Sequence, residues 1–141
     1  MKQASNAVCG LLLGEFDENH LIIRDVFRNA GWTLIEPRTL QEGLDHVERD
    51  SAQVVIVRSE FSGGDWKEVL QNLKERPQLP QLIVTSRTAD DKLWSEVLNC
   101  GGYDVLAEPF DREEVERVVA AAWRHYGPPR ALTAGGVTPF V

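Results

Sequence analysis

The amino-acid sequence predicts a single-domain α/β protein, a doubly wound parallel sheet with helices packed on both faces. The chain has 141 residues, the size of one domain. Five short apolar runs alternate with amphipathic stretches, and such alternation produces parallel strands joined by right-handed crossovers. The third run, Val54–Val57, is entirely β-branched, which is typical of a strand covered on both faces.

The expected strands are apolar runs bounded by turn residues. Pro37 closes the second run, and Gly63 and Gly64 break the chain after the third. In chain order, the strands are expected at residues 7–13, 33–35, 54–57, 82–85 and 103–107.

The first three expected helices have apolar residues at helical spacing and recognisable ends. The first covers residues 18–30 and ends at Gly31, as at a C-cap. Thr39, with Glu42 three residues later, has the pattern of a capping box that opens the second helix. Asp65 can cap the third.

The last two helices carry similar signals. Thr88 with Asp91 is expected to open the fourth helix, which the pair Gly101 and Gly102 ends. Asp111 with Glu114 is expected to cap the fifth.

At this length the common solution is a (βα)5 three-layer sandwich with the flavodoxin-like strand order 2-1-3-4-5. Ligands of such sheets bind beyond the carboxyl ends of the strands, near the point where the strand order reverses. The residues that follow the strands should therefore meet there although they are distant in sequence: Gly14, Glu15, Arg58, Thr85 and Glu108.

The domain is expected to span residues 1–125, after which the sequence changes character. Residues 126–141, YGPPRALTAGGVTPFV, are rich in Pro, Gly, Ala and Thr and have no amphipathic period, which predicts a flexible tail. The alternative is that its apolar tip, Val137–Val141, packs on this or a neighbouring subunit.

Roughly residues 7–125 resemble the receiver domain of bacterial response regulators. AGW at 30–32 is similar to the A-G-Y/F end of the first receiver helix, and SGGDW at 62–66 stands in the place of the P-x-M-D-G turn. QLIVTS at 81–86 resembles P-I-I-x-L-T-A. The most specific segment is GGYDVLAEPFDREEVERVV at 101–119, which resembles G-A-D-D-Y-L-x-K-P-F-D-x-E-E-L.

The resemblance implies a site for a phosphoryl switch. In receivers, two acids after the first strand and an aspartate ending the third bind magnesium, and that aspartate accepts the phosphoryl group. A Thr or Ser after the fourth strand and a Lys after the fifth hold that group. By position these roles fall on Gly14 with Glu15, on Arg58, on Thr85 and on Glu108, so only Thr85 and the acidity of Glu15 keep the family pattern.

Arg58 removes the chemistry that the resemblance implies. Covalent transfer at this position needs a carboxylate nucleophile, and a guanidinium has no lone pair available. Magnesium prefers carboxylate oxygen, which a central guanidinium would replace by a positive charge. We therefore predict a degenerate pseudo-receiver without a metal, a cofactor or enzymatic activity.

The charges at the third and fifth strands are exchanged relative to the family, because arginine replaces aspartate and glutamate replaces lysine. This exchange predicts an ion pair from Arg58 to Glu108, with a fork to Glu15, that fixes the pocket without metal or phosphate. The alternative is that Arg58 extends into solvent at a degenerated site.

The function implied is a stand-alone receiver-like protein of two-component (phosphorelay) signalling that binds protein partners without phosphorylation. A histidine kinase or another signalling protein would bind the face of the fourth helix, fifth strand and fifth helix, which could also form a homodimer. Trp94 lies on that fourth helix. Val105 replaces the aromatic residue that reports the switch in the family, and its short, stiff side chain cannot swing in that way.

Composition excludes several other classes. A formal net charge of −7 argues against nucleic acid or an anionic membrane as the main partner, and no run of about 18 apolar residues exists. Cys9 and Cys100 form no C-x-x-C pair, which favours reduced thiols in the cytoplasm. His20, His46 and His125 lie on different expected helices, which makes a zinc site unexpected.

Two other functions stay open. One is a receiver phosphorylated at a displaced acceptor, for which Ser59, Glu60 and Asp17 are the candidates. The other is a small flavodoxin-like nucleotide-binding protein or enzyme, whose loop after the first strand would hold a phosphate. That loop, GEFDENH at 14–20, is acidic and has one glycine and no Ser or Thr, so it disfavours phosphate.

Overall fold

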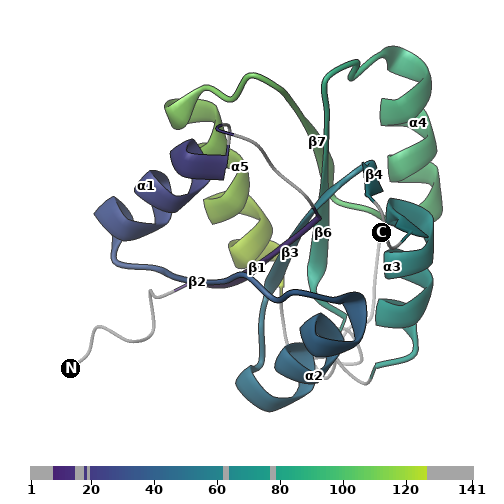
Figure 1. Ribbon diagram of the computed structural model, residues 1–141. Coiled ribbons are helices and arrows are strands. Elements are labelled where there is room, and N and C mark those ends of the chain that lie inside the picture. Colours follow the sequence, from purple (N-terminus) through teal and green to yellow (C-terminus); the bar gives the residue numbers. More distant parts are fainter. Residues whose placement is uncertain (1–7, 15–17, 19, 62–63, 77–78, 127–141) are drawn as a thin grey trace.

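The computed structural model describes residues 8–14, 18, 20–61, 64–76 and 79–126. These residues form a parallel five-stranded sheet with helices on both faces (Figure 1). The strands of the sheet are β1 (Cys9–Leu13), β2 (Thr33–Ile35), β3 (Val54–Arg58), β6 (Gln81–Ser86) and β7 (Asp104–Ala107). The helices are α1 (His20–Ala30), α2 (Leu40–Asp50), α3 (Trp66–Lys74), α4 (Asp91–Cys100) and α5 (Arg112–His125).

The strand order is β2-β1-β3-β6-β7. Since β6 and β7 are the fourth and fifth strands of the sheet, this is the predicted 2-1-3-4-5 order, which is confirmed. In the register of β3 and β6, Arg58 lies opposite Thr85. In that of β6 and β7, Ser86 lies opposite Ala107, directly before Glu108. The topology thus brings the carboxyl ends of three strands together at one edge.

Two apolar clusters, one on each face, hold the sandwich together. Figure 1 shows α1 and α5 on one side of the sheet and α2, α3 and α4 on the other. The cluster beneath α1 and α5 includes Phe27, Ile56 and Val119, all at most 1% exposed. The opposite cluster includes Val55 and Leu73. Alternate residues of β3 thus point to opposite faces, as a strand buried on both sides requires.

Side-chain caps explain where several helices begin. Thr39 Oγ1 accepts a hydrogen bond from the Glu42 amide at 3.1 Å, and Asp65 Oδ1 accepts one from the Glu68 amide at 3.1 Å. Both caps were predicted. Asp111 stands at the N-cap of α5 but makes no side-chain cap hydrogen bond.

The predicted start of α4 was wrong. Asp90, not Thr88, is the N-cap, and its Oδ1 accepts a hydrogen bond from the Leu93 amide at 2.9 Å. The Thr88 amide instead donates to Ser86 Oγ at 3.1 Å, which places Thr88 in the loop after β6. Asp90 lies only two residues after Thr88 and is equally suited to an N-cap, but it was not considered as one from the sequence.

A short antiparallel hairpin of β4 (Glu60–Phe61) and β5 (Gly64–Asp65) was not predicted. It joins β3 to α3, where the sequence indicated only a break in the chain. The expected tail, residues 126–141, lies outside the described residues beyond Tyr126. No helix in the described part of the chain is long and apolar enough to cross a bilayer.

Candidate functional site

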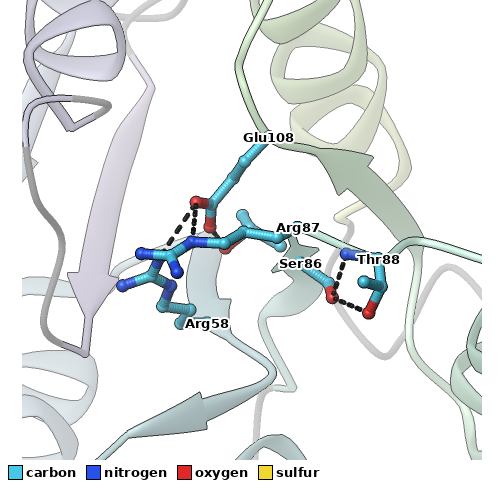
Figure 2. Close-up of polar contacts among 6 residues, drawn as sticks. Arg58, Ser86, Arg87, Thr88 and Glu108 are labelled. Carbon is cyan, nitrogen blue, oxygen red and sulfur yellow. Dashed lines mark hydrogen bonds and ion pairs between the residues drawn. The ribbon is translucent and has the colours of Figure 1, made fainter.

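An ion pair joins the ends of β3 and β7. Arg58 is the last residue of β3, and Glu108 follows β7 directly. Arg58 Nη2 donates to Glu108 Oε1 at 3.0 Å, and the two side chains are 16% and 1% exposed (Figure 2). The predicted contact between these residues is present, and the alternative in which Arg58 extends into solvent does not describe its side chain.

Thr85 holds the second oxygen of the same carboxylate. It is fully buried near the end of β6, opposite Arg58 in the sheet register. Its hydroxyl donates to Glu108 Oε2 at 3.2 Å. The buried carboxylate therefore has a cation at one oxygen and a hydroxyl at the other, which are the partners that a buried charge requires.

Arg87 also approaches this carboxylate, and the sequence reasoning missed it. Arg87 Nε lies 3.9 Å from Glu108 Oε1, at the outer limit of an ion pair, and its side chain is 68% exposed. In Figure 2 the guanidinium groups of Arg58 and Arg87 reach the same carboxylate oxygen from different segments. A signal was available, because Arg87 follows Thr85 by two residues and side chains two apart in an extended segment point to the same side.

Backbone hydrogen bonds continue past the ends of the strands and fix these positions. The Ser59 amide donates to the Thr85 carbonyl at 2.8 Å, and the Glu108 amide donates to the Ser86 carbonyl at 2.9 Å. The peptide bond between Glu108 and Pro109 is cis. The ion pair is therefore formed between residues whose backbones are already tied to β6, the strand between them.

The predicted positions after β1 are only partly described. Gly14 is exposed and has a φ of 113°, a left-handed conformation that favours glycine. Glu15, the predicted second partner of Arg58, lies outside the described residues, as does Asp17. The fork from Arg58 to Glu15 and the assignment of these positions to a degenerate phosphorylation site stay predictions.

The described side chains do not fit a magnesium ion. Magnesium requires several oxygen ligands in octahedral geometry. At this edge the guanidinium of Arg58 ends β3, and the Glu108 carboxylate is bonded to it. Across the described ranges there is also no group of three or more His, Cys, Asp or Glu residues that could hold a metal.

The predicted partner-binding residues lie at the β7 edge of the sheet. Trp94 on α4 is 48% exposed, and its indole N–H donates to Asp104 Oδ1 at 3.1 Å. Leu98, one turn further along α4, is also exposed. Val105 is 8% exposed and packs in the cluster beneath α2, α3 and α4. Trp94 is thus an exposed aromatic residue anchored to the edge strand, whereas Val105 is a core residue.

Comparison with known proteins identifies the fold. No protein-family model matches the chain. A transcriptional regulatory protein of Bacillus subtilis (strain 168), the uncharacterised YrkP, is 28% identical over 106 residues, which cover 74% of this chain and 45% of that protein. The chain thus corresponds to less than half of the length of this relative.

Similar solved structures cover a larger share of the chain. A signal receiver domain from Vibrio parahaemolyticus has a TM-score of 0.77 at 15% identity and covers 92% of this chain and 98% of its own. A Francisella receiver domain has a TM-score of 0.74 at 18% identity, covering 85% and 99%. The receiver domain of an HD domain-containing protein from Pseudomonas fluorescens Pf-5 has a TM-score of 0.72 at 20% identity, covering 85% and 97%. The chain has the fold of response-regulator receiver domains, as the sequence resemblance predicted.

Proposed function

We propose that this chain is a receiver-like module of two-component (phosphorelay) signalling that binds other proteins without being phosphorylated. The observation that carries the proposal is the ion pair between Arg58 and Glu108 at the carboxyl edge of a receiver fold. In this fold the edge is the place where a receiver would accept its phosphoryl group. Here the last residue of β3 is Arg58, and its guanidinium cannot serve as the nucleophile that accepts a phosphoryl group.

The pair supplies internally what a metal and a phosphoryl group would supply from outside. The buried Glu108 carboxylate is held by Arg58 and Thr85, so that the ends of β3, β6 and β7 are tied together in a single arrangement. We infer that the module has one state at this edge and is controlled by the amount of protein or by its partners. The proposal places it in the cytoplasm and gives it no enzymatic activity.

The proposed docking face is formed by α4, β7 and α5. Trp94 and Leu98 expose apolar surface there, and aromatic residues are enriched where proteins bind one another. A histidine kinase, another signalling protein or a second copy of the chain is the proposed partner.

Incubation with a small phosphodonor and magnesium tests the chemical part of the proposal. We expect no mass increase in the intact protein, because the residue ending β3 has no carboxylate. An ordinary receiver domain treated in parallel provides the positive control. A gain of one phosphoryl group would contradict the proposal and favour a displaced acceptor, and the same measurement on Ser59→Ala would show whether Ser59 carries it.

Partner capture from the native cell tests the docking face. Trp94→Ala should lose most of the specific partner, because truncating an exposed aromatic anchor commonly weakens an interface by about 2 kcal/mol or more. Leu21→Ala is the matched control, since Leu21 is also 48% exposed but lies on α1, on the opposite side of the sheet from α4. Equal capture by both variants and the wild type would exclude α4 as the docking element.

A further inference from the structure

The outer edge of β7 is closed by a side chain of the strand itself. β7 is the last strand of the sheet, and within the described residues no other strand pairs with its outer side. Asp104 Oδ1 accepts two hydrogen bonds there, from the Val105 amide at 2.8 Å and from the Trp94 indole N–H at 3.1 Å. We propose that the Asp104 carboxylate is a latch, which keeps β7 from pairing with β7 of a second copy of the chain.

The direction of the backbone groups places the Val105 amide on the open edge. Alternate residues of a strand direct their N–H and C=O groups to opposite sides. The Glu108 amide donates to the Ser86 carbonyl, so the backbone groups of Glu108 face β6, as do those of every second residue before it. Val105 and Ala107 therefore present their backbone groups to the outer side. Such groups at a sheet edge are a template on which another strand can pair.

A second copy of the chain fits this edge because the edge is complementary to itself. A two-fold axis through Val105 would bring two β7 strands together in antiparallel orientation, so that each Val105 N–H meets the Val105 C=O of the other copy. Ala107, whose side chain is exposed, would then face the second strand as well. The Val105 N–H is the donor at the centre of this pairing, and in the structure Asp104 already holds it.

Trp94 ties the latch to a second element. Its indole belongs to α4 and donates to the same oxygen as the Val105 amide, so it restricts the rotation of the Asp104 carboxylate. The negative charge of Asp104 also opposes pairing, because the two carboxylates would lie diagonally across the axis, with their Cα atoms roughly 7–8 Å apart. Hydrogen bonding and charge therefore have to be separated by experiment.

The inference rests on the open edge of the sheet and not on the proposed function. A chain that accepted a phosphoryl group, or that bound no partner at α4, would still have this edge to close. The two proposals can therefore fail independently.

Sedimentation velocity of the purified chain over a range of concentrations tests the latch. Asp104→Ala should dimerise about tenfold more tightly than the wild type or more, because each copy then has an edge N–H without its acceptor. Asp104→Asn should self-associate as the wild type does, since its amide oxygen can accept both hydrogen bonds. Asp45→Ala is the matched control and should behave as the wild type. Asp45 is exposed, accepts one hydrogen bond from Gln41 at 3.2 Å, and lies on α2, which packs against β1.

Hydrogen exchange of the Ala107 amide shows where the two copies meet. In Asp104→Ala this exchange should slow as the protein concentration rises, because a second strand covers the edge, whereas in the wild type it should not depend on concentration. Asp104→Val also lacks an acceptor, favours a strand, and should give the same result if the alanine variant does not fold.

Three outcomes would overturn the latch. Asp104→Ala and Asp104→Val could dimerise no more tightly than the wild type. Asp104→Asn could dimerise as tightly as Asp104→Ala, which would show that charge alone closes the edge. The Ala107 amide could exchange at the same rate in dimer and monomer, which would place the contact elsewhere.

Discussion

Two arginine–glutamate pairs in this molecule look alike in geometry but lie in different surroundings. Arg24 on α1 reaches Glu36, just after β2, through two hydrogen bonds of 2.7 and 3.2 Å, with side chains 46% and 33% exposed. Arg58 reaches Glu108 through a hydrogen bond of 3.0 Å, with side chains 16% and 1% exposed. The pair with the shorter N–O distance, Arg24 with Glu36, is therefore the more exposed to solvent.

The difference teaches that burial, and not distance, decides what such a pair does. Glu36 raises the pKa of the Arg24 guanidinium through its hydrogen bond, so Arg24 stays charged, but solvent and salt screen its attraction. At the carboxyl edge, the Glu108 side chain has almost no contact with water, and its oxygens are bonded to protein groups instead. Losing Arg58 would remove the close cation of a buried carboxylate and leave the exposed Arg87 at 3.9 Å, which is more costly than losing a surface contact.

The largest expected effect comes from breaking the buried pair on one side. Arg58→Ala should lower the free energy of unfolding by about 3 kcal/mol, because the buried Glu108 carboxylate then loses its close cation and keeps the more distant, exposed Arg87. Urea unfolding followed by circular dichroism measures this change.

Arg24→Ala is the matched control for that experiment. It should leave the unfolding midpoint unchanged within error, since an exposed pair of this kind contributes little. Comparable losses of stability in the two variants would show that burial does not separate the two pairs.

A smaller effect is expected when the whole buried cluster is replaced by apolar residues. The triple variant R58M/T85V/E108L removes the charges and the hydroxyl together, so no buried polar group of the three is left without its partner. Its free energy of unfolding should lie within about 1 kcal/mol of the wild type or above it, because desolvation offsets most of the attraction in a buried pair.

This variant sharpens the comparison, because it separates the cost of an orphaned charge from the net contribution of the pair. A triple variant as unstable as Arg58→Ala would mean that the intact pair itself stabilises the fold, and that its role exceeds fixing the geometry of the edge.

Much of this fold could be predicted because local signals agreed with the global pattern. The β-branched run Val54–Val57 and the capping pattern at Thr39 each indicated one structure only. The contact between Arg58 and Glu108 was predictable too, since parallel strands place their carboxyl ends at one edge and only β6 separates the two strands that these residues follow or end.

The features that sequence reasoning missed depend on local details of the loops, such as which of two nearby residues caps a helix. Thr88 and Asp90 can both cap a helix, and the choice followed from the hydrogen bond that Ser86 makes with the Thr88 amide. The approach of Arg87 to Glu108 was signalled by its place two residues after Thr85, but it also depends on how the loop after β6 turns. The hairpin of β4 and β5 was hidden because its two-residue strands are too short to show a period.

The exposed indole of Trp94 has a practical consequence. Trp66 is buried, and Trp32 and Trp123 are partly covered by the core beneath α1 and α5, so the Trp94 side chain, hydrogen-bonded to Asp104, is the most open to solvent of these four rings. Acrylamide should quench its fluorescence first, and any molecule resting on α4 should shield it. The unlabelled protein therefore carries its own optical sensor for occupancy of that helix.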